Sequence, residues 1–168
     1  MAKVDVSRIY AIAAFARWSC DGRPTYESME SGIEALIGRR SERREEQRTD
    51  PSKPTEAAVL AAEREFERKR AYYMDMMAAE KVWNVFKDKR QGVFLECVYL
   101  REPRDVFKRG EISRRMNECC AILQLDDALK KAGGKSPESG YRYLRQVNRL
   151  FCIERGITFG DFEKFFQK

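Results

Sequence analysis

Residues 136–155, SPESGYRYLRQVNRLFCIER, decide what kind of fold this chain adopts. Ser136 is a strong N-terminal cap, Pro137 suits the first helical position, and Glu138 follows in the first turn. Gly156 comes directly after the stretch and is a typical stop signal. Apolar side chains recur at helical spacing, so the stretch predicts an amphipathic helix. The side chains that we expect this helix to bury are Tyr141, Leu144, Val147 and Phe151.

The rest of the chain also has helical periodicity and capping signals, which predicts an all-α fold. Residues 90–102 could form a strand by composition, but no second strand-like run is available to pair with them. Residues 56–90 would form a helix about 50 Å long at about 1.5 Å per residue, too long for a compact small domain. We expect this helix to project as a solvated arm, with pairing to another chain as the alternative. The predicted helices are 5–20, 27–37, 56–90, 90–102, 111–132 and 136–155.

Residues 39–54, RRSERREEQRTDPSKP, contain no apolar side chain and two prolines. This composition is typical of a solvated linker, and Gly38 before it is a plausible helix stop. A nucleic-acid-binding tract is the alternative, weakened by the glutamates that interrupt the arginines. The predicted organisation is an N-terminal helical segment (1–38), a charged linker (39–55), and a long helix followed by a C-terminal helix-turn-helix domain (56–168).

Composition excludes several kinds of chemistry. The 168 residues include 33 Lys and Arg, 27 Asp and Glu, and no His, so catalysis and zinc binding through imidazole are excluded. No nucleophile–base pair stands out, and the adjacent carboxylates of Asp126 and Asp127 diverge on a helix. The five cysteines form no C-x-x-C pair and are typical of reduced, mostly buried thiols, with a disulfide or a cysteine-only metal site as the lesser alternative. We therefore expect no enzyme activity, no cofactor and no metal.

The positive charge is concentrated near the C-terminus. Residues 104–168 carry 14 basic and 9 acidic side chains, which is most of the formal net charge of +6. Such an excess suits a polyanionic partner, although an ordinary Lys/Arg surface has the same composition. No apolar run approaches the roughly 18 residues of a membrane span, so we expect no membrane partner and a cytoplasmic location.

The helices 111–132 and 136–155, joined by Gly133-Gly134-Lys135, have the layout of a helix-turn-helix. In that motif the second helix enters the major groove and its first turns face the base edges, where arginine pairs well with guanine. A solvated outer face of an ordinary amphipathic helix is the alternative. The candidate DNA-binding residues in this register are Lys135, Ser136, Ser139, Arg142, Arg145 and Arg149.

A second register of the motif would begin its recognition helix near Ser113, after a short helix within 104–109. Arg114 and Arg115 would then read DNA. Cys119 and Cys120 lie in the middle of that helix and are poor phosphate ligands, so this register ranks second.

Three segments resemble phage late-gene antiterminators of the Q-like family. The opening AIAAFARWSCDGRPTYESMESGIEALIG has a helix with a Trp near its end, a turn, and a short segment with Ser and Met. An apolar helix, VFLECVYLREP, and a helix rich in Tyr, Arg and Leu, SPESGYRYLRQVNRLF, follow in a similar order. The C-terminal layout is also similar to sigma factor region 4 and to phage late-gene activators. The charged stretch 39–70 departs from this pattern.

The resemblance implies a phage transcription regulator in the cytoplasm of a bacterial host. Such a protein would bind double-stranded DNA near a late promoter, engage bacterial RNA polymerase with its sigma factor, and allow transcription past terminators. Ser139, Arg142 and Arg145 would inherit the DNA-reading role by position. Family members with a zinc-binding insertion have paired cysteines that this chain lacks. The alternatives are a late-gene activator and a non-enzymatic helical interaction protein.

Overall fold

The computed structural model describes residues 5–49, 55–130 and 137–157, and it confirms the all-α fold class. The elements occur in the order α1 (Val6–Cys20), α2 (Tyr26–Thr49), α3 (Glu56–Phe86), α4 (Arg90–Leu95), a π-helical turn η1 (Glu96–Leu100), a 3₁₀ turn η2 (Pro103–Asp105), α5 (Glu111–Lys130) and α6 (Pro137–Arg155). No strand occurs in these ranges. None of the helices described is long and apolar enough to cross a membrane.

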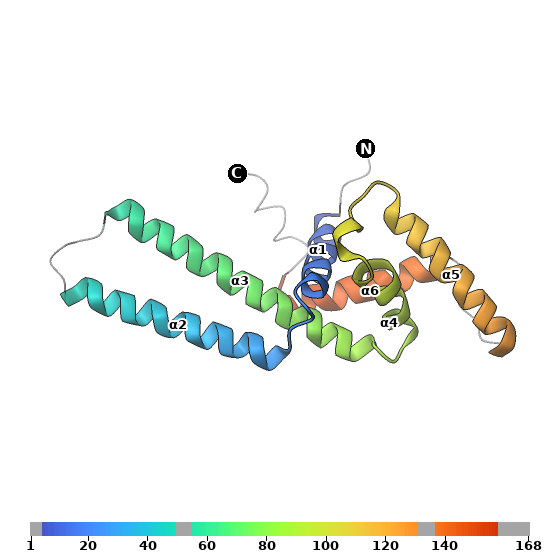
Figure 1. Ribbon diagram of the computed structural model, residues 1–168, viewed down its shortest axis with the longest axis horizontal. Helices are drawn as coiled ribbons and strands as arrows, with labels where there is room; N and C mark the ends of the chain where they lie inside the picture. Colours follow the sequence, from blue (N-terminus) through green and yellow to red (C-terminus); the bar gives the residue numbers. More distant parts are fainter. Residues whose placement is uncertain (1–4, 50–54, 131–136, 158–168) are drawn as a thin grey trace.

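The body of the protein is a cluster of short helices around one apolar core (Figure 1). α1, η1, α5, α6 and the C-terminal half of α3 all contribute to that core. The indole N–H of Trp18 donates to the carbonyl of Pro24 at 3.0 Å, so its one polar group is satisfied inside the core. The largest fully buried side chains are Trp18, Tyr99, Phe15, Phe94 and Phe151.

α2 and the N-terminal half of α3 form a helical hairpin that projects from this body (Figure 1). The expected helix end at Gly38 and the linker over 39–49 are therefore wrong, because α2 continues to Thr49. The remaining linker positions, 50–54, lie outside the described residues. The projection expected for the long helix is present, but its partner is α2 of the same chain.

Charge pairing explains why this polar segment is helical. The guanidinium of Arg40 lies 2.6 Å from Glu63 of α3 and also over the ring of Phe66, 4.2 Å from its centroid. Arg44 lies 3.4 Å from the same Glu63 carboxylate. Leu36 and Phe66 are buried between the two helices, so a small apolar contact accompanies the ion pairs. A helix that is polar on nearly every side is thus stabilised by α3.

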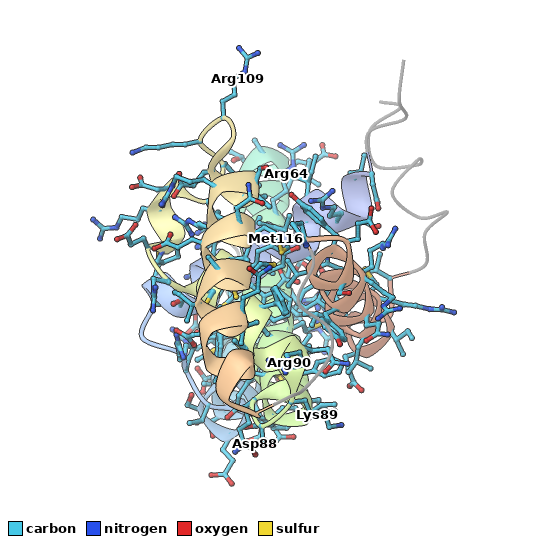
Figure 2. All side chains as sticks on the ribbon, turned by 90° about the vertical axis from the view of Figure 1, so that its right-hand side faces the viewer. Arg64, Asp88, Lys89, Arg90, Arg109 and Met116 are labelled. Carbon is cyan, nitrogen blue, oxygen red and sulfur yellow. The ribbon has the colours of Figure 1, made fainter. Side chains whose placement is uncertain are left out.

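α6 is the central helix of the C-terminal part and begins at Pro137 as expected. Leu144, Val147 and Phe151 are buried as predicted, whereas the fourth residue of the predicted stripe, Tyr141, is only half-buried. Gly156 follows the helix with a φ of 71°. Gly140 allows α6 to approach α4 and α5 closely, since an added Cβ would overlap the sulfur of Met116 and the ring of Phe94. Figure 2 shows Met116 at this junction, whereas Arg109 projects from the loop before α5.

Candidate nucleic-acid interface

An exposed basic stripe lies along α6. Arg142, Arg145 and Arg149 are all exposed, at the i, i+3 and i+7 positions opposite the buried stripe. None of these three guanidiniums forms an ion pair in the part of the chain that the structure describes. Arg142 lies over the ring of its neighbour Tyr143, 5.7 Å from the centroid, which leaves its N–H donors available. The stripe is therefore a surface of unneutralised cationic donors.

The charged residues near the C-terminal end of α6 are paired with other helices. Glu154, the acidic residue nearest the end of α6, lies 3.3 Å from Lys81 of α3. Arg155 is turned inward, where its Nε donates to Asp75 at 2.6 Å. Tyr10 of α1 donates to the same carboxylate at 2.7 Å, so Asp75 ties α6 to α1 and α3. Burial raises the pKa of Asp75, and the two hydrogen bonds oppose that rise.

Arg8 of α1 extends the basic surface beyond α6. Arg8 and Arg145 line a common cavity of about 180 Å³ between α1, η1 and α6. The positive charge of Arg8 lies near the Tyr99 hydroxyl and acts to lower the pKa of Tyr99, against the larger effect of burial. We name the set made of the exposed Arg142, Arg145 and Arg149 and the half-buried Arg8 the α6 basic face.

Asn148 lies at the inner wall of this cavity. Its side-chain amide donates to the Tyr99 hydroxyl at 3.2 Å, while its Oδ1 is buried with no hydrogen-bond partner in the described structure. Burial is the main reason why the pKa of Tyr99 is raised, so its hydroxyl stays protonated and neutral. The cavity thus combines cationic donors at its mouth with neutral polar groups inside.

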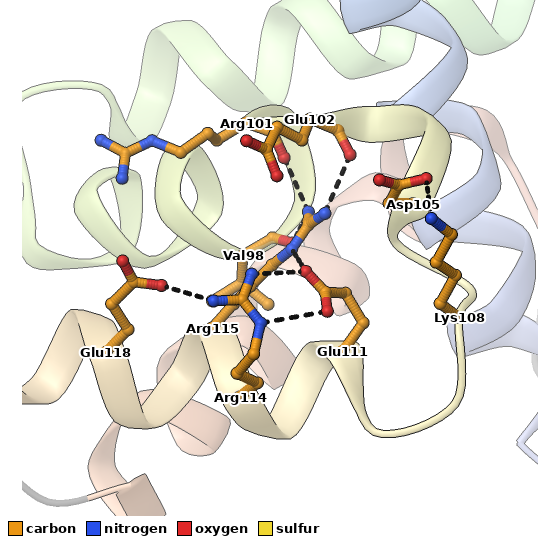
Figure 3. A network of polar contacts seen from close by, with 9 residues as sticks. All are labelled: Val98, Arg101, Glu102, Asp105, Lys108, Glu111, Arg114, Arg115 and Glu118. Carbon is orange, nitrogen blue, oxygen red and sulfur yellow. Dashed lines mark hydrogen bonds and ion pairs between the residues drawn. The ribbon is translucent and has the colours of Figure 1, made fainter.

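Arg115 does not lie on an exposed surface, as the second register requires, and the DNA-reading role of Arg114 stays a prediction; Figure 3 shows the contacts of both side chains. The side chain of Arg115 is only 4% exposed, and its guanidinium donates to Glu111 and to the carbonyls of Val98, Arg101 and Glu102. Arg115 is therefore an internal clamp between α5 and the η1–η2 turn, and the prediction that it reads DNA is wrong. Arg114 is exposed but lies 2.7 Å from Glu111 and 3.0 Å from Glu118.

The remaining predicted site residues lie at the start of α6. Lys135 and Ser136 are outside the described residues, as is the 131–136 turn that would join the two helices of the motif. Ser139 is partly buried and already has an interaction partner. α5 and α6 do pack against each other. The helix-turn-helix motif itself stays a prediction, because the residues between the two helices lie outside the described ones.

Sequence reasoning missed Arg8, although its helix was predicted. Nothing in the local pattern of α1 indicates that it packs beside α6, which is more than a hundred residues away. The burial of Arg115, in contrast, could have been predicted from its spacing to neighbouring residues. Arg115 follows Ile112 by three residues, precedes Cys119 by four, and follows Glu111 by four, so it lies on the apolar side of α5 with an ion-pair partner one turn away.

No group of three or more carboxylates and cysteines in the described ranges is arranged to hold a metal ion. Comparisons with models of protein families, with curated proteins and with solved structures found nothing that matches this chain.

Proposed function

We propose that the protein is a non-enzymatic, DNA-binding transcription regulator that contacts the duplex through the α6 basic face. The observation that carries the proposal is that Arg142, Arg145 and Arg149 form an exposed stripe with no ion-pair partner in the described structure, whereas Arg40, Arg68, Arg114 and Arg115 are paired. Phosphate groups attract unpaired guanidiniums most strongly, because no internal carboxylate has to be displaced.

The position of α6 supports the same proposal. Its inner face is fixed by Leu144, Val147 and Phe151 in the core, so the outer arginines stand on a rigid element. Recognition of DNA by a helix needs such rigid presentation, with the first turns of the helix toward base edges and the later turns toward phosphates. Arg142 is nearest to the helix start and suits a base contact; Arg145, Arg149 and Arg8 suit the backbone.

The finer proposal, which rests on the resemblance, is a Q-like phage antiterminator. Such a protein also needs a surface for bacterial RNA polymerase and its sigma factor. The α2–α3 hairpin is the element that reaches furthest from the body (Figure 1) and is the part that we assign to this protein contact. A conventional late-gene activator would use the same two surfaces without travelling with the polymerase.

The test of DNA binding is fluorescence anisotropy across a salt series. The duplexes are the region upstream of the gene that encodes the protein and a scrambled duplex of equal length. Arg142→Ala and Arg145→Ala are expected to weaken binding by about 1–3 kcal/mol where the residue contacts a base, and to a smaller, sequence-independent extent where it contacts phosphate. Arg68→Ala, which removes the same charge from an exposed but paired residue of α3, is the matched control and is expected to have little effect.

Absence of salt-dependent binding to either duplex would overturn the assignment of the α6 basic face. The alternative function, a helical interaction protein that docks through the hairpin alone, would then be favoured. If DNA binding is found, read-through of a terminator by purified polymerase distinguishes an antiterminator from an activator.

A further inference from the structure

Two cysteines from different elements meet beside the Arg115 clamp. Cys97 belongs to η1 and is partly exposed, while Cys119 of α5 is buried. The Cys119 thiol lies close enough to the Cys97 sulfur to lower the pKa of Cys97. Both cysteines line one cavity of about 150 Å³, which also has Arg101 and Arg114 on its wall. The two sulfurs are therefore neighbours with a route to solvent.

The surroundings make Cys97 the more reactive of the two. The hydrogen bond from Cys119 is the main reason why the pKa of Cys97 is lowered to about 7, and the nearby charge of Arg101 acts in the same direction. The same contact and burial raise the pKa of Cys119. Cys97 therefore has more thiolate at neutral pH than an ordinary cysteine, which is a few per cent thiolate. Burial raises the pKa of Cys120, and burial together with the negative charge of Asp5 raises the pKa of Cys152.

We propose that Cys97 and Cys119 form a dithiol site that hydroperoxides oxidise to an intramolecular disulfide. The thiolate sulfur of Cys97 attacks one oxygen of hydrogen peroxide and the O–O bond breaks, which gives a sulfenic acid and, after protonation of the leaving hydroxide, one water. The sulfur of Cys119 then attacks the sulfenic sulfur. The S–O bond breaks, the S–S bond forms, and the thiol proton leaves with the hydroxyl as a second water. Both sulfurs are oxidised and the peroxide is reduced.

The structure also shows what such a bond would do. It would join η1 directly to α5, beside the place where Arg115 already holds these elements together (Figure 3). A disulfide requires the sulfurs to approach to about 2.05 Å with a restricted torsion angle, so small rotations of the two side chains are needed. This proposal is independent of DNA binding, because no residue of the α6 basic face takes part.

Neighbouring cysteines supply matched controls. Cys120 follows Cys119 in the chain and is equally buried, but its side chain points about 100° away around the helix. Cys20 on α1 is exposed and lacks a cysteine partner in the described structure. Its rate of oxidation therefore shows how fast an exposed thiol reacts without a neighbouring thiol. Neither should form the cross-link in the folded protein.

The experiment treats the folded full chain with hydrogen peroxide at neutral pH and maps its peptides without reduction. Cleavage after Arg and Lys places Cys97 in the peptide 91–101 and both Cys119 and Cys120 in the peptide 116–130. The expected product is these two peptides joined through Cys119, in the wild type and in Cys120→Ser alike. Cys119→Ser should instead accumulate Cys97 sulfenic acid, which dimedone traps, and Cys97→Ser should form no cross-link. Circular dichroism verifies that each variant is folded.

Three results would overturn the proposal. The first is a cross-link through Cys120 or Cys20 instead of Cys119. The second is oxidation of Cys97 to the sulfinic acid in the wild type without a cross-link. The third is faster dimedone labelling of Cys20 than of Cys97 in Cys119→Ser. If either serine variant fails to fold, trapping of the sulfenic acid in the wild type and peptide mapping of Cys120→Ser still decide the question.

Discussion

Arg115 and Glu111 form an ion pair at the base of α5, with Arg115 Nε 2.8 Å from Glu111 Oε1. The two residues are one helical turn apart, but the guanidinium does more than pair within the helix. Its Nη1 donates to the carbonyls of Val98 at 3.0 Å and Arg101 at 2.6 Å, and its Nη2 donates to Glu102 at 2.9 Å (Figure 3). The Val98 and Arg101 carbonyls lie at the end of η1, and the Glu102 carbonyl, at the start of η2, also accepts from the backbone N–H of Asp105. One side chain therefore adds donors to the backbone acceptors of the whole η1–η2 turn.

Loss of this clamp should destabilise the whole domain. Arg115→Ala removes the guanidinium donors to the carbonyls of Val98 and Arg101 and leaves Glu111 without its inner partner, so we expect the free energy of unfolding to fall by about 3 kcal/mol. Arg115→Lys should be almost as unstable as Arg115→Ala, because one ammonium group cannot reproduce the planar set of N–H donors of a guanidinium. Urea unfolding followed by circular dichroism measures both. A change below about 0.5 kcal/mol for Arg115→Ala, as expected at an ordinary surface position, would contradict the assignment.

The same pair predicts a pH dependence. Hydrogen bonds from Arg114 and Arg115 lower the pKa of Glu111 from about 4.5 to about 2. The folded state therefore favours the ionised carboxylate more than the unfolded state does. Its contribution to the free energy of unfolding is complete above the unfolded pKa and is lost as pH falls from about 4.5 to about 2. In Glu111→Gln, the free energy of unfolding should therefore change less with pH over this range than in the wild type. If the two proteins lose stability in parallel as the pH falls, Glu111 is not the cause of this pH dependence.

The helices of the body were predictable because each has an apolar stripe or a clear cap. α6 is the clearest case, since Pro137, the buried stripe and Gly156 agree with one another. α2 was not predictable beyond Gly38, because its distal half has almost no apolar side chains. Its stability comes from Glu63 and Phe66 on another helix, and no local pattern records that contact.

The candidate site was predictable only in part, for the same physical reason. Helical spacing was enough to place Arg142, Arg145 and Arg149 on the outer face of α6. Tertiary packing decides the rest: it brings Arg8 to this surface and turns Arg115 into the interior. From composition alone these arginines are equivalent. Only the structure shows which of them are paired with a carboxylate and which are not.

Gly140 should be the most sensitive small residue of the C-terminal part. A methyl group there would overlap the Met116 sulfur and lie 2.6 Å from the Phe94 ring, so Gly140→Ala should cost about 1–3 kcal/mol of unfolding free energy despite the better helix propensity of alanine. The flexible Met116 side chain is the nearest obstacle. In a double-mutant cycle, Gly140→Ala should therefore cost less in a Met116→Ala background, and strict additivity of the two changes would contradict the proposed overlap.

Arg8 and Arg145 should act as one unit in DNA binding, although they come from helices at opposite ends of the chain. They line the same cavity, so a single phosphate can contact both guanidiniums. Removing either residue should reduce the dependence of log K on log salt by about 1, and removing both should have less than the summed effect on affinity. Arg114→Ala removes the same charge from a residue paired with Glu111 and Glu118, and it should leave the salt dependence almost unchanged. Equal effects of Arg8→Ala and Arg114→Ala would mean that overall charge, and not the α6 basic face, attracts the DNA.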